Sequence, residues 1–302
     1  MIKPMLAKLT DKPFDDNRYI WETKYDGIRC IAKTEATGYQ LWSRSGSDKT
    51  KLFPDLELRT KVPAILDGEL VCQSDGFSGI QHRANRKNNV AWASIQYPAT
   101  YFVFDCLGVA AFLSPLGKIL APFGQDIDCI CLSLMKRKQI LESILIETHN
   151  VKIAPYTENG IALYEQIKLA HGEGVIGKLK TGTYQQGKRE WLKVKVPQIG
   201  EFVICGYTQG TGWRSSTFGA LVLGKFDEPP YLTYVGNVGT GFDEAEIARL
   251  FRELTSLNET VCPFAREPEK ATWVEPTIRV MVKYLEYTND GKLRFPSYKG
   301  II

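Results

Sequence analysis

The sequence lacks the clustered cysteines and histidines of a structural zinc site. Seven cysteines are spread over 302 residues without a CxxC pair, and the three histidines, His82, His149 and His171, stand far apart. A structural zinc site is therefore not expected. Scattered cysteines in apolar surroundings are typical of a reducing compartment rather than of a disulfide framework, so we expect a cytoplasmic location.

Long hydrophobic runs are also missing, as is a strong excess of charge of one sign. The amino-terminal stretch Met1–Asp16 has no apolar core and no small-residue cleavage site, so it does not resemble a signal peptide. The most apolar stretch, Val109–Leu120, is interrupted by Ser114, Pro115 and Lys118 and is too short to span a bilayer. With 38 Lys and Arg against 34 Asp and Glu, the net charge of +4 is too small to indicate a polyanionic partner by itself.

Length and composition indicate a globular chain of two domains. At about 150 residues per domain the chain has room for two, and 44% hydrophobic with 24% charged residues is ordinary for globular proteins. The composition changes after Lys195, where VPQIGEF has the proline and glycine of a short hinge. We expect an α+β domain at 1–196 and a mostly β domain at 197–302.

Short runs of β-branched and aromatic residues predict strands, and runs with helical spacing predict helices. The expected strands are Tyr19–Lys24, Ile28–Lys33, Tyr39–Trp42, Ile65–Val71, Ala99–Asp105, Val175–Leu179, Phe202–Thr208, Phe218–Phe226, Tyr231–Asn237 and Thr277–Thr288. The expected helices are Leu132–His149, Ile161–Ala170 with Gly172 as its C′ glycine, and Asp243–Ser256 with Asp243 as its N-cap. Short strands with one inserted helix suggest that the second domain is a small barrel.

The segment KYDGIR places Lys24 after one predicted strand and Arg29 on the next. Its Asp-Gly pair fits the turn of an ordinary β-hairpin, and the spacing alone favours that simpler interpretation. A lysine is a useful nucleophile only as a neutral amine, which requires burial or neighbouring cations. A functional interpretation therefore needs other charged groups at the same place.

Further charged and aromatic residues stand at the ends of predicted strands. They are Arg44 in SRSG, Glu69 in DGEL, Phe104 in FVFDCL, Glu173 in EGVIGK, and Trp191, Lys193 and Lys195 in REWLKVK. The last three alternate along a strand, so they point to one face. Two lysines aimed at one place repel each other unless an anion, such as a nucleotide phosphate, lies between them. Taken singly, each residue also fits a core position or a solvated strand end.

Together, KYDGIR, SRSG, DGEL, FVFDCL, EGVIGK and WLKVK resemble, in order and spacing, the motifs of the covalent nucleotidyltransferases. The chain most resembles the small ATP-dependent DNA ligases of bacterial and viral type, from about Met5 to Gly300. FVICGYTQGTGWRSSTFGALVLGKF and RFPSYKG resemble the oligonucleotide-binding (OB) domain of ligases rather than that of capping enzymes. The resemblance implies an adenylation domain of antiparallel sheets with flanking helices at 1–196, followed by an OB-fold β-barrel at 197–302.

The resemblance also implies an activity, which is the sealing of 3′-hydroxyl/5′-phosphate nicks in duplex DNA through a lysyl-AMP and a DNA-adenylate. Lys24 would be the nucleophile that carries AMP. ATP would be bound by Glu22, Thr23, Arg29, Arg44, Glu69, Phe104, Ile176, Lys193 and Lys195. A divalent cation, Mg²⁺ or Mn²⁺, would be held by Glu69 and Glu173.

Within this implied set, each residue has its own role. At the adenine, Glu22 and Thr23 would lie at the edge of the base, Phe104 would stack on the ring and Ile176 would pack under it. At the sugar, Glu69 would contact the ribose, and Arg29 would contact the sugar or the nick. At the phosphates, Arg44 would bind phosphates including the 5′-phosphate of the nick, and Lys193 and Lys195 would bind the α-phosphate.

Basic residues outside these motifs supply candidate DNA contacts. The resemblance and the basic run RANRK (residues 83–87) together imply the DNA-binding residues Arg44, Arg83, Arg86 and Arg214. The run Lys136–Lys138 fits the solvated face of a helix better than a phosphate site. Phosphate contacts would give sequence-independent binding, as nick sealing requires. We expect a monomer without membrane contact, associated with the nucleoid, whose partner is nicked duplex DNA.

Two segments depart from the family pattern. After RFPSYKG the sequence ends at Ile302, where the resembled ligases continue to an arginine that orients the pyrophosphate. We expect weaker self-adenylylation here and retained sealing of a pre-adenylated nick, unless a nearby lysine or arginine substitutes. Val109–Ile130 is more apolar than an exposed loop and has no assigned function.

Two alternative functions remain open at this point. One is an RNA ligase or a capping-type nucleotidyltransferase on the same scaffold, against which the GALVLG and RFPSYKG segments argue. The other is a nucleic-acid-binding protein without catalytic activity, against which the intact set Lys24, Glu69, Glu173, Lys193 and Lys195 argues.

Overall fold

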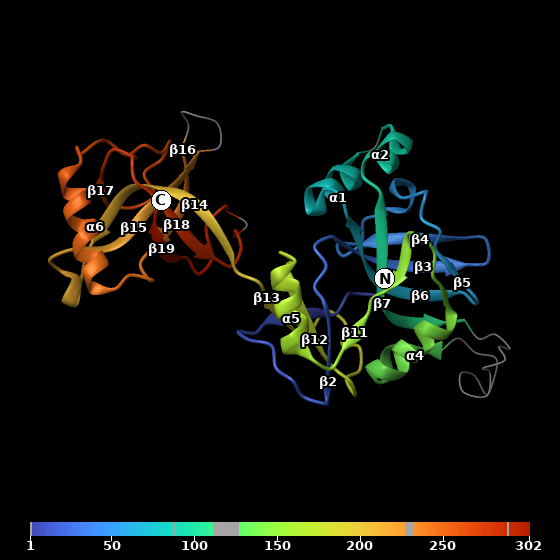
Figure 1. Ribbon diagram of the computed structural model, residues 1–302. Coiled ribbons are helices and arrows are strands. Elements are labelled where there is room, and N and C mark those ends of the chain that lie inside the picture. Colours follow the sequence, from blue (N-terminus) through green and yellow to red (C-terminus); the bar gives the residue numbers. More distant parts are fainter. Residues whose placement is uncertain (1, 87, 111–126, 227–231, 289) are drawn as a thin grey trace. The chain divides into compact units, whose positions relative to one another are not determined.

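The structure, a computed structural model, describes residues 2–86, 88–110, 127–226, 232–288 and 290–302. The chain divides into two compact units, Met1–Val196 and Pro197–Ile302 (Figure 1). Both contain helices and mostly antiparallel sheets, which confirms the predicted α+β class. None of the helices in the described ranges is long and apolar enough to cross a membrane.

The first unit contains two main sheets, of which the first has five strands. In spatial order they are β1 (Leu6–Leu9), β13 (Arg189–Lys195), β12 (Gly174–Leu179), β2 (Tyr19–Thr23) and β11 (Tyr156–Thr157). Only β1 and β13 pair in parallel. Helix α5 (Gly160–Leu169) covers the outer face, where Trp21, Val175 and Val194 pack against its Leu163 and Ile167.

The second sheet of this unit carries two helices on one face. Its strands, in order, are β10 (Val151–Ile153), β7 (Ala99–Val109), β6 (Ala64–Cys72), β3 (Ile28–Glu35) and β4 (Gly38–Ser43), with β8 (Ile127–Asp128) beside β7. Helices α1 (Gly76–Asn85) and α4 (Leu134–Ile144) pack against one core cluster with these strands. Smaller elements are α2 (Val90–Gln96), the 3-10 turns η1 (Thr50–Leu52) and η2 (Cys129–Cys131), and the pair β5 (Arg59–Thr60) and β9 (Leu145–Ile146).

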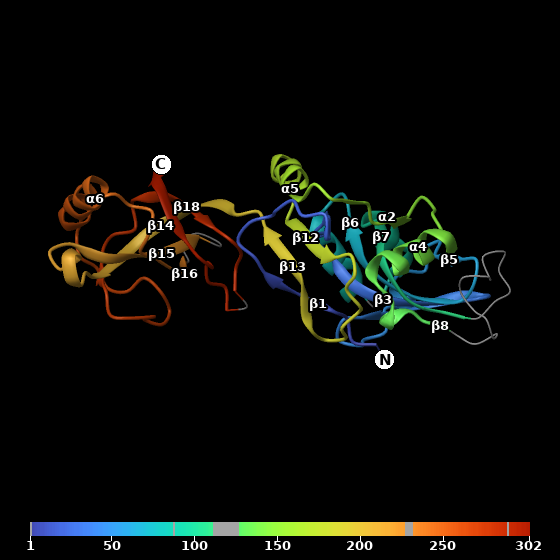
Figure 2. The ribbon, with the colours of Figure 1, turned by 90° about the horizontal axis from the view of Figure 1, so that it is seen from below.

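The inner faces of the two sheets meet in a separate cluster. Successive side chains of a strand point to opposite faces, so residues alternate between the helix-covered face and this inner face. Phe104 and Ile31 of the second sheet pack there with Trp191 and Ile176 of the first. Figure 2 shows β12 and β13 on one side of the unit and β3, β6 and β7 on the other. Polar side chains on these inner faces therefore converge between the sheets.

The second unit is built on one antiparallel sheet with a helix against it. Its strands, in order, are β16 (Leu232–Val238), β15 (Phe218–Phe226), β14 (Gln198–Gln209), β18 (Arg279–Tyr284) and β19 (Ser297–Ile301), with β17 (Thr272–Trp273) beside β14. The short turn η3 (Gly212–Arg214) lies between β14 and β15. Helix α6 (Glu244–Ser256) buries Ile247, Leu250 and Leu254 in the core. The strand pairings of the described residues leave this sheet open at β16 and β19.

Several predicted elements are confirmed closely because local signals determine them. β15 has the predicted bounds Phe218–Phe226. Asp243 caps α6, since its carboxylate accepts a hydrogen bond of 2.7 Å from the backbone N–H of Glu246. The strands predicted before and after KYDGIR and at DGEL and FVFD are present as β2, β3, β6 and β7.

Other predictions were wrong at element ends. The helix predicted to reach His149 ends at Ile144, because Leu145 joins β9 and pairs with β5. His171, not Gly172, takes the left-handed conformation after α5, with φ of 54°. The strand predicted at Thr277–Thr288 is shorter, Arg279–Tyr284.

Three further predictions concern connecting segments. Most of the predicted hinge VPQIGEF belongs to β14, which starts at Gln198. The sequence patterns did not predict α1 or α2. Of the apolar segment Val109–Ile130, the part 111–126 lies outside the described residues, while Val109 ends β7 and Asp128 pairs with Gly108.

Candidate active site

Lys24 lies between two sheets and not in a hairpin. β2, which ends at Thr23, belongs to the first sheet, whereas β3, which starts at Ile28, belongs to the second. The hairpin interpretation of KYDGIR is therefore wrong. Gly27 lets the backbone pass close to Leu70, because a Cβ at this position would lie 2.2 Å from the Leu70 carbonyl oxygen. The backbone N–H of Lys24 donates to the Gly174 carbonyl at 2.9 Å, which anchors this crossing beside EGVIGK.

A cavity of about 200 Å³ opens beside Lys24 between the inner faces of the sheets. The structure brings most of the predicted nucleotide-binding residues together around it: Glu22, Thr23, Lys24, Arg29, Arg44, Glu69, Phe104, Ile176 and Lys193. The lining also includes Leu6, Ala7, Tyr25, Lys178, Arg189 and Trp191, which were not predicted as site residues. A pocket with one aromatic wall and several charged groups suits a ligand with a flat ring and phosphates.

Glu173 and Lys195, which were also predicted as site residues, lie next to Lys24 but outside the lining of the cavity. Glu173 Oε2 lies 2.5 Å from Lys24 Nζ, and its Oε1 lies 3.0 Å from Lys195 Nζ. All three side chains are mostly buried, with exposed fractions between 11% and 21%. Glu173 therefore bridges the side chains of Lys24 and Lys195.

Glu69 is the second carboxylate that the sequence predicts as a metal ligand. Burial raises the pKa of its carboxyl to about 8, against the opposing effect of Arg29 and Lys24. Among the described residues no group of three or more His, Cys, Asp or Glu side chains could hold a metal ion. Mg²⁺ completes its shell with phosphate and water oxygens. Glu69 and Glu173 therefore fit a cation that arrives with a nucleotide better than a permanently bound one.

Arg29 forms a rigid wall of the cavity. Its Nε and Nη2 donate to the two Asp67 carboxylate oxygens at 2.9 and 2.6 Å, and its Nη1 donates to the Met5 carbonyl at 2.6 Å. The guanidinium also lies 5.2 Å from the centre of the Phe104 ring and 4.8 Å from that of Trp191. This bidentate pair leaves Arg29 little freedom, so any contact with a sugar uses the donors that remain.

Glu22, also in the lining of the cavity, is buried between two lysines. Its Oε1 is 2.5 Å from Lys138 Nζ on α4, and its Oε2 is 2.6 Å from Lys178 Nζ on β12. Burial alone would raise the pKa of the Glu22 carboxyl, but Lys138 and Lys178 outweigh burial and hold the pKa below its usual value. Glu22 is thus an ionised carboxylate that only accepts hydrogen bonds.

Family comparisons match both units. The model of the ATP dependent DNA ligase domain matches residues 4–195, and that of the ATP dependent DNA ligase C terminal region matches residues 214–301. The chain belongs to the ATP-dependent DNA ligase family. Both models describe DNA ligases, which confirms the resemblance seen in the motifs and argues against the RNA-ligase and capping-enzyme alternatives.

Relatives in this ligase family include long and short proteins. The LigD non-homologous end joining protein of Mycolicibacterium smegmatis is 31% identical over 314 residues, which cover 99% of this chain and 38% of that protein. The chain thus spans less than half the length of this LigD relative. The SPbeta prophage-derived DNA ligase-like protein LigB of Bacillus subtilis is 28% identical over 307 residues, covering 99% of this chain and 98% of LigB.

Solved ligase structures share the fold. The ligase domain of Mycobacterium tuberculosis LigD aligns with a TM-score of 0.54 and 26% identity over 100% of this chain and 95% of that domain. A mycobacterial DNA ligase D complexed with ATP and MES aligns with a TM-score of 0.52 and 25% identity, over the same shares of each chain.

Arg83 is not available for DNA, which corrects the sequence prediction. Its side chain is fully buried, forms an ion pair with Asp55 and donates to the carbonyls of Leu52 and Tyr97 at 3.3 and 3.1 Å. The basic run RANRK contains one inward-facing arginine because α1 packs that face against the sheet. Arg83 therefore joins α1 to the segment around Asp55.

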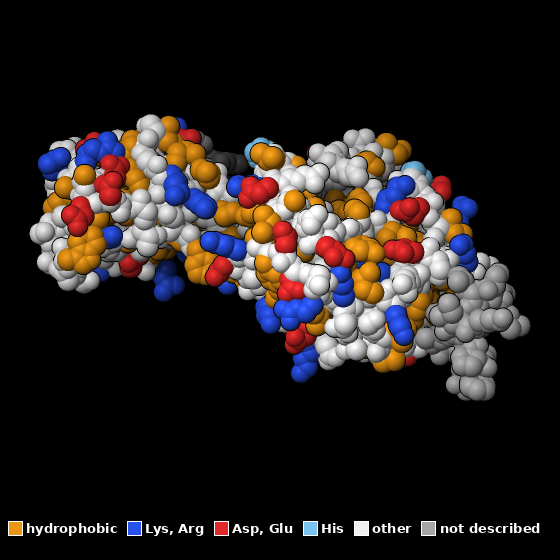
Figure 3. Space-filling view, turned by 60° about the horizontal axis from the view of Figure 1, so that its bottom comes forward, with side chains coloured by type: hydrophobic (Ala, Val, Ile, Leu, Met, Phe, Trp, Pro, Cys, Tyr) orange, Lys and Arg blue, Asp and Glu red, His pale blue; other side chains and the backbone are white. Residues whose placement is uncertain are grey.

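The other predicted DNA contacts lie at the surface or near it. Arg44 and Arg86 are exposed, and Arg86 lies 4.5 Å from the centre of the Trp92 ring. Arg214 is half-buried, since its Nη1 donates to the carbonyls of Gly219 and Gly239. On the face of the first unit seen in Figure 3, basic and acidic side chains are intermixed, in keeping with the small net charge.

Sequence reasoning missed several residues that shape the cavity. The run Lys136–Lys138 is not a solvated face as predicted, because Arg137 and Lys138 are buried and only Lys136 is exposed. Lys178 could have been found, since strand alternation from Ile176 in EGVIGK places it on the cavity side. Strand alternation also places Asp67, two residues before Glu69, on the same face as Glu69. No sequence pattern indicated that Lys138 would be near the cavity.

Proposed function

We propose that this protein is an ATP-dependent DNA ligase that seals 3′-hydroxyl/5′-phosphate nicks in duplex DNA. The observation that carries the proposal is the cavity in which Lys24 contacts Glu173 at one end while Phe104 and Glu22 lie in the wall. ATP is the nucleotide, and its adenosine occupies the cavity with its α-phosphate at Lys24. In this proposal the unit Met1–Val196, which contains the cavity, is the adenylation domain.

In the first step Lys24 becomes covalently adenylylated. The ammonium releases its proton to solvent, and Nζ then attacks the α-phosphorus of ATP. The new nitrogen–phosphorus bond replaces the bond to pyrophosphate, which leaves with its electron pair. Phosphoryl transfer depends on position and on charge neutralisation, and Lys193 and Lys195 neutralise charge at the α-phosphate. Mg²⁺ or Mn²⁺, with Glu69 and Glu173 as protein ligands, would supply further neutralisation of the phosphates.

The base and sugar are held by the remaining residues of the cavity. Phe104 stacks on the adenine ring, and Ile176 packs under it. Glu22, beside Thr23, accepts a hydrogen bond from the exocyclic amine. Arg29 and Glu69 contact the ribose.

The later steps transfer AMP to the DNA and release it. The 5′-phosphate at the nick attacks the lysyl-AMP phosphorus, which gives a DNA-adenylate and frees Lys24. The 3′-hydroxyl then attacks the 5′-phosphorus, and AMP leaves. Arg44, Arg86 and Arg214 contact DNA phosphates, which makes binding independent of sequence and sensitive to salt. The monomer acts on DNA in the nucleoid.

The second unit, Pro197–Ile302, is the OB-fold domain of this ligase in our proposal. Short antiparallel strands with a single inserted helix, α6, support that assignment. Its exposed Trp213, with Arg214 4.7 Å from the ring centre, offers a flat, cationic contact for nucleic acid.

The deciding experiment measures intact mass after incubation with ATP and Mg²⁺. We expect a gain of one AMP unit in the parent protein and none in Lys24→Ala, while Lys188→Ala, at an exposed lysine, behaves as the parent. The protein as purified is measured first, because it can already carry AMP. A parent that neither carries nor gains AMP, and that fails to seal a pre-adenylated nick, would contradict the proposal.

A further inference from the structure

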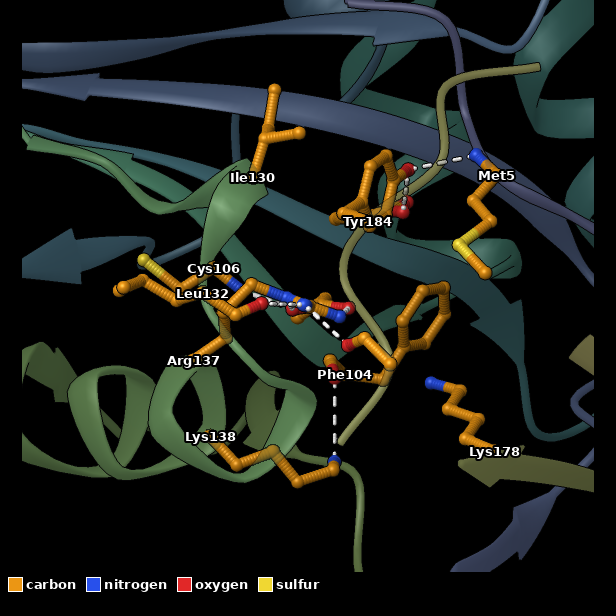
Figure 4. Close-up of polar contacts among 12 residues, drawn as sticks. Met5, Phe104, Cys106, Ile130, Leu132, Arg137, Lys138, Lys178 and Tyr184 are labelled. Carbon is orange, nitrogen blue, oxygen red and sulfur yellow. Dashed lines mark hydrogen bonds and ion pairs between the residues drawn. The ribbon is translucent and has the colours of Figure 1, made fainter. Parts of the chain in front are cut away.

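Two consecutive cations of α4 are buried against the middle of β7. Arg137 and Lys138 are each about 1% exposed. The guanidinium of Arg137 donates from Nε and Nη2 to the two carboxylate oxygens of Asp105 at 2.7 and 3.0 Å. Lys138 Nζ donates to the carbonyl of Phe104 at 3.3 Å. Figure 4 shows both side chains rising from the helix toward this strand.

Lys138 also reaches the other sheet of the unit. The same Nζ lies 2.5 Å from Oε1 of Glu22, which comes from β2. Phe104 belongs to β7, in the sheet that carries α4. One ammonium therefore ties together the two residues that the proposed function places against the nucleobase, and these two residues come from different sheets.

Charge balance does not require Lys138. Lys178 Nζ already lies 2.6 Å from Oε2 of Glu22, and it sits 4.3 and 4.1 Å from the ring centres of Phe104 and Trp191. One carboxylate and one ammonium would be neutral, whereas the second ammonium leaves a buried excess of positive charge. Burying a charge is costly, and an apolar side chain of similar length would fill the space. The position of Lys138 thus calls for a role beyond stability.

We propose that Lys138 is a positioning residue for nucleobase selection, an inference that rests on the proposed function. It holds the ionised Glu22 carboxylate in place at the base while it holds Phe104 at the stacking position. At the 6-position adenine presents an amino donor, whereas guanine presents a carbonyl acceptor. An ionised carboxylate accepts a hydrogen bond from the adenine amino group and repels the guanine carbonyl oxygen. Lys138 therefore contributes to the preference for ATP over GTP without touching the nucleotide.

The test compares two variants of Lys138 with a matched control on the same helix. Lys138→Met removes the charge and leaves Glu22 balanced by Lys178 alone, so folding is expected to be retained. Lys138→Gln also removes the charge but keeps an N–H donor for the Phe104 carbonyl. Lys136→Met removes an exposed lysine of α4 and is expected to behave as the parent.

The measurement is the rate of lysyl-AMP or lysyl-GMP formation as a function of ATP or GTP concentration. For Lys138→Met we expect KM for ATP to rise about tenfold or more while kcat changes little, because Glu22 and Phe104 are no longer held in position to bind the base. The ratio of kcat/KM for ATP to that for GTP is expected to fall by a similar factor. Lys138→Gln is expected to lie between Lys138→Met and the parent.

A purely structural role predicts another pattern. Equal losses for ATP and GTP, or a fall in kcat alone, would overturn the inference, as would failure of both variants to fold. If the parent neither carries nor forms a covalent adduct with either nucleotide and also fails to seal a pre-adenylated nick, the proposed function fails. Calorimetric binding of ATP and GTP to the parent and to Lys138→Met then decides the inference separately: a loss of ATP preference supports it, and an unchanged preference overturns it.

Discussion

The two units of the chain place their charged side chains differently. In the part of the chain that the structure describes, every buried charged residue lies in the first unit: Glu22, Asp67, Arg83, Asp105, Arg137, Lys138 and Lys178. In the second unit each described ion pair has at least one exposed side chain, and in Arg279–Glu201 both are exposed, at 62% and 47%. The core of that unit is formed mainly by aliphatic and phenylalanine side chains, a few tyrosines and one tryptophan, Trp273.

The buried charges of the first unit are related to its cavity. Buried pairs are rarely a net gain in stability over apolar packing, so seven buried charges in one unit call for a reason besides stability. Of these seven, Glu22, Asp67, Lys138 and Lys178 line the cavity or contact a residue that lines it. Asp105 directly follows the lining residue Phe104 along β7. The first unit therefore holds its site through charge pairs in fixed positions, whereas the second unit is held together by ordinary hydrophobic burial.

The largest expected effect separates activity from folding within the first unit. Lys24→Ala is expected to lower nick sealing by a factor of about 10⁴ or more, as loss of a nucleophile does. The free energy of unfolding is expected to change much less than the activity, because Glu173 keeps Lys195 as its partner at 3.0 Å. Sealing of a labelled nicked duplex and urea unfolding measure the two effects. Residual sealing near the parent rate would remove Lys24 from the mechanism.

The next effect contrasts a buried pair with an exposed one. Arg137→Met leaves Asp105 charged and fully buried without its partner, so we expect a loss of about 3–5 kcal/mol in the free energy of unfolding. Arg279→Met, in the second unit, breaks an exposed pair and is expected to lose about 0.2–1 kcal/mol at most. Denaturant unfolding of both variants makes the comparison. Similar losses would show that the two units do not differ in this respect.

A pH dependence is expected from the buried carboxylate of the first unit. The pKa of Glu22 is lower in the folded state than its ordinary value of 4.5, so the unfolded state binds more protons as the pH falls through that window. The stability that Glu22 contributes is therefore present above pH 4.5 and is lost as the pH falls through the lower folded-state value.

Thermal unfolding of the parent and of Glu22→Gln as a function of pH tests this dependence. The variant is expected to be less stable at neutral pH, since two buried ammonium groups lose their carboxylate, and its stability is expected to fall less steeply below pH 4.5. Parallel curves for the two proteins would contradict the assignment.

The smallest effect compares helix caps in the two units. Asp243 accepts a hydrogen bond from Glu246 N–H at the start of α6, so Asp243→Ala is expected to lose about 1 kcal/mol. Ser133, before α4, makes no such side-chain bond, and Ser133→Ala is expected to lose less than about 0.5 kcal/mol. Urea midpoints measure both, and an equal loss at the two caps would show that the hydrogen bond at Asp243 adds nothing.

Features with local signals could be predicted from the sequence. β15 and the Asp243 cap depend on residues that are neighbours in the chain, so alternation and capping chemistry are enough to find them. The order of KYDGIR, DGEL, FVFDCL, EGVIGK and WLKVK was sufficient for the family, which the ligase models confirm. Helix ends were less predictable, because Leu145 continues the apolar spacing of α4 while it pairs in β9.

Partners distant in the chain could not be predicted. From the sequence, KYDGIR fitted a hairpin, but Lys24 lies between strands of two different sheets. Arg83 was predicted to contact DNA and Lys136–Lys138 to form a solvated face, but Arg83 and Lys138 are buried. Whether a charge is buried depends on which face of its helix meets the sheet, and that depends on elements far away in sequence. The amino-acid sequence by itself determined the family, the main strands and the identity of the chemical groups. Only the packing of two sheets and α4 decided which of those groups meet, because ion pairs and burial form between elements that the chain does not place side by side.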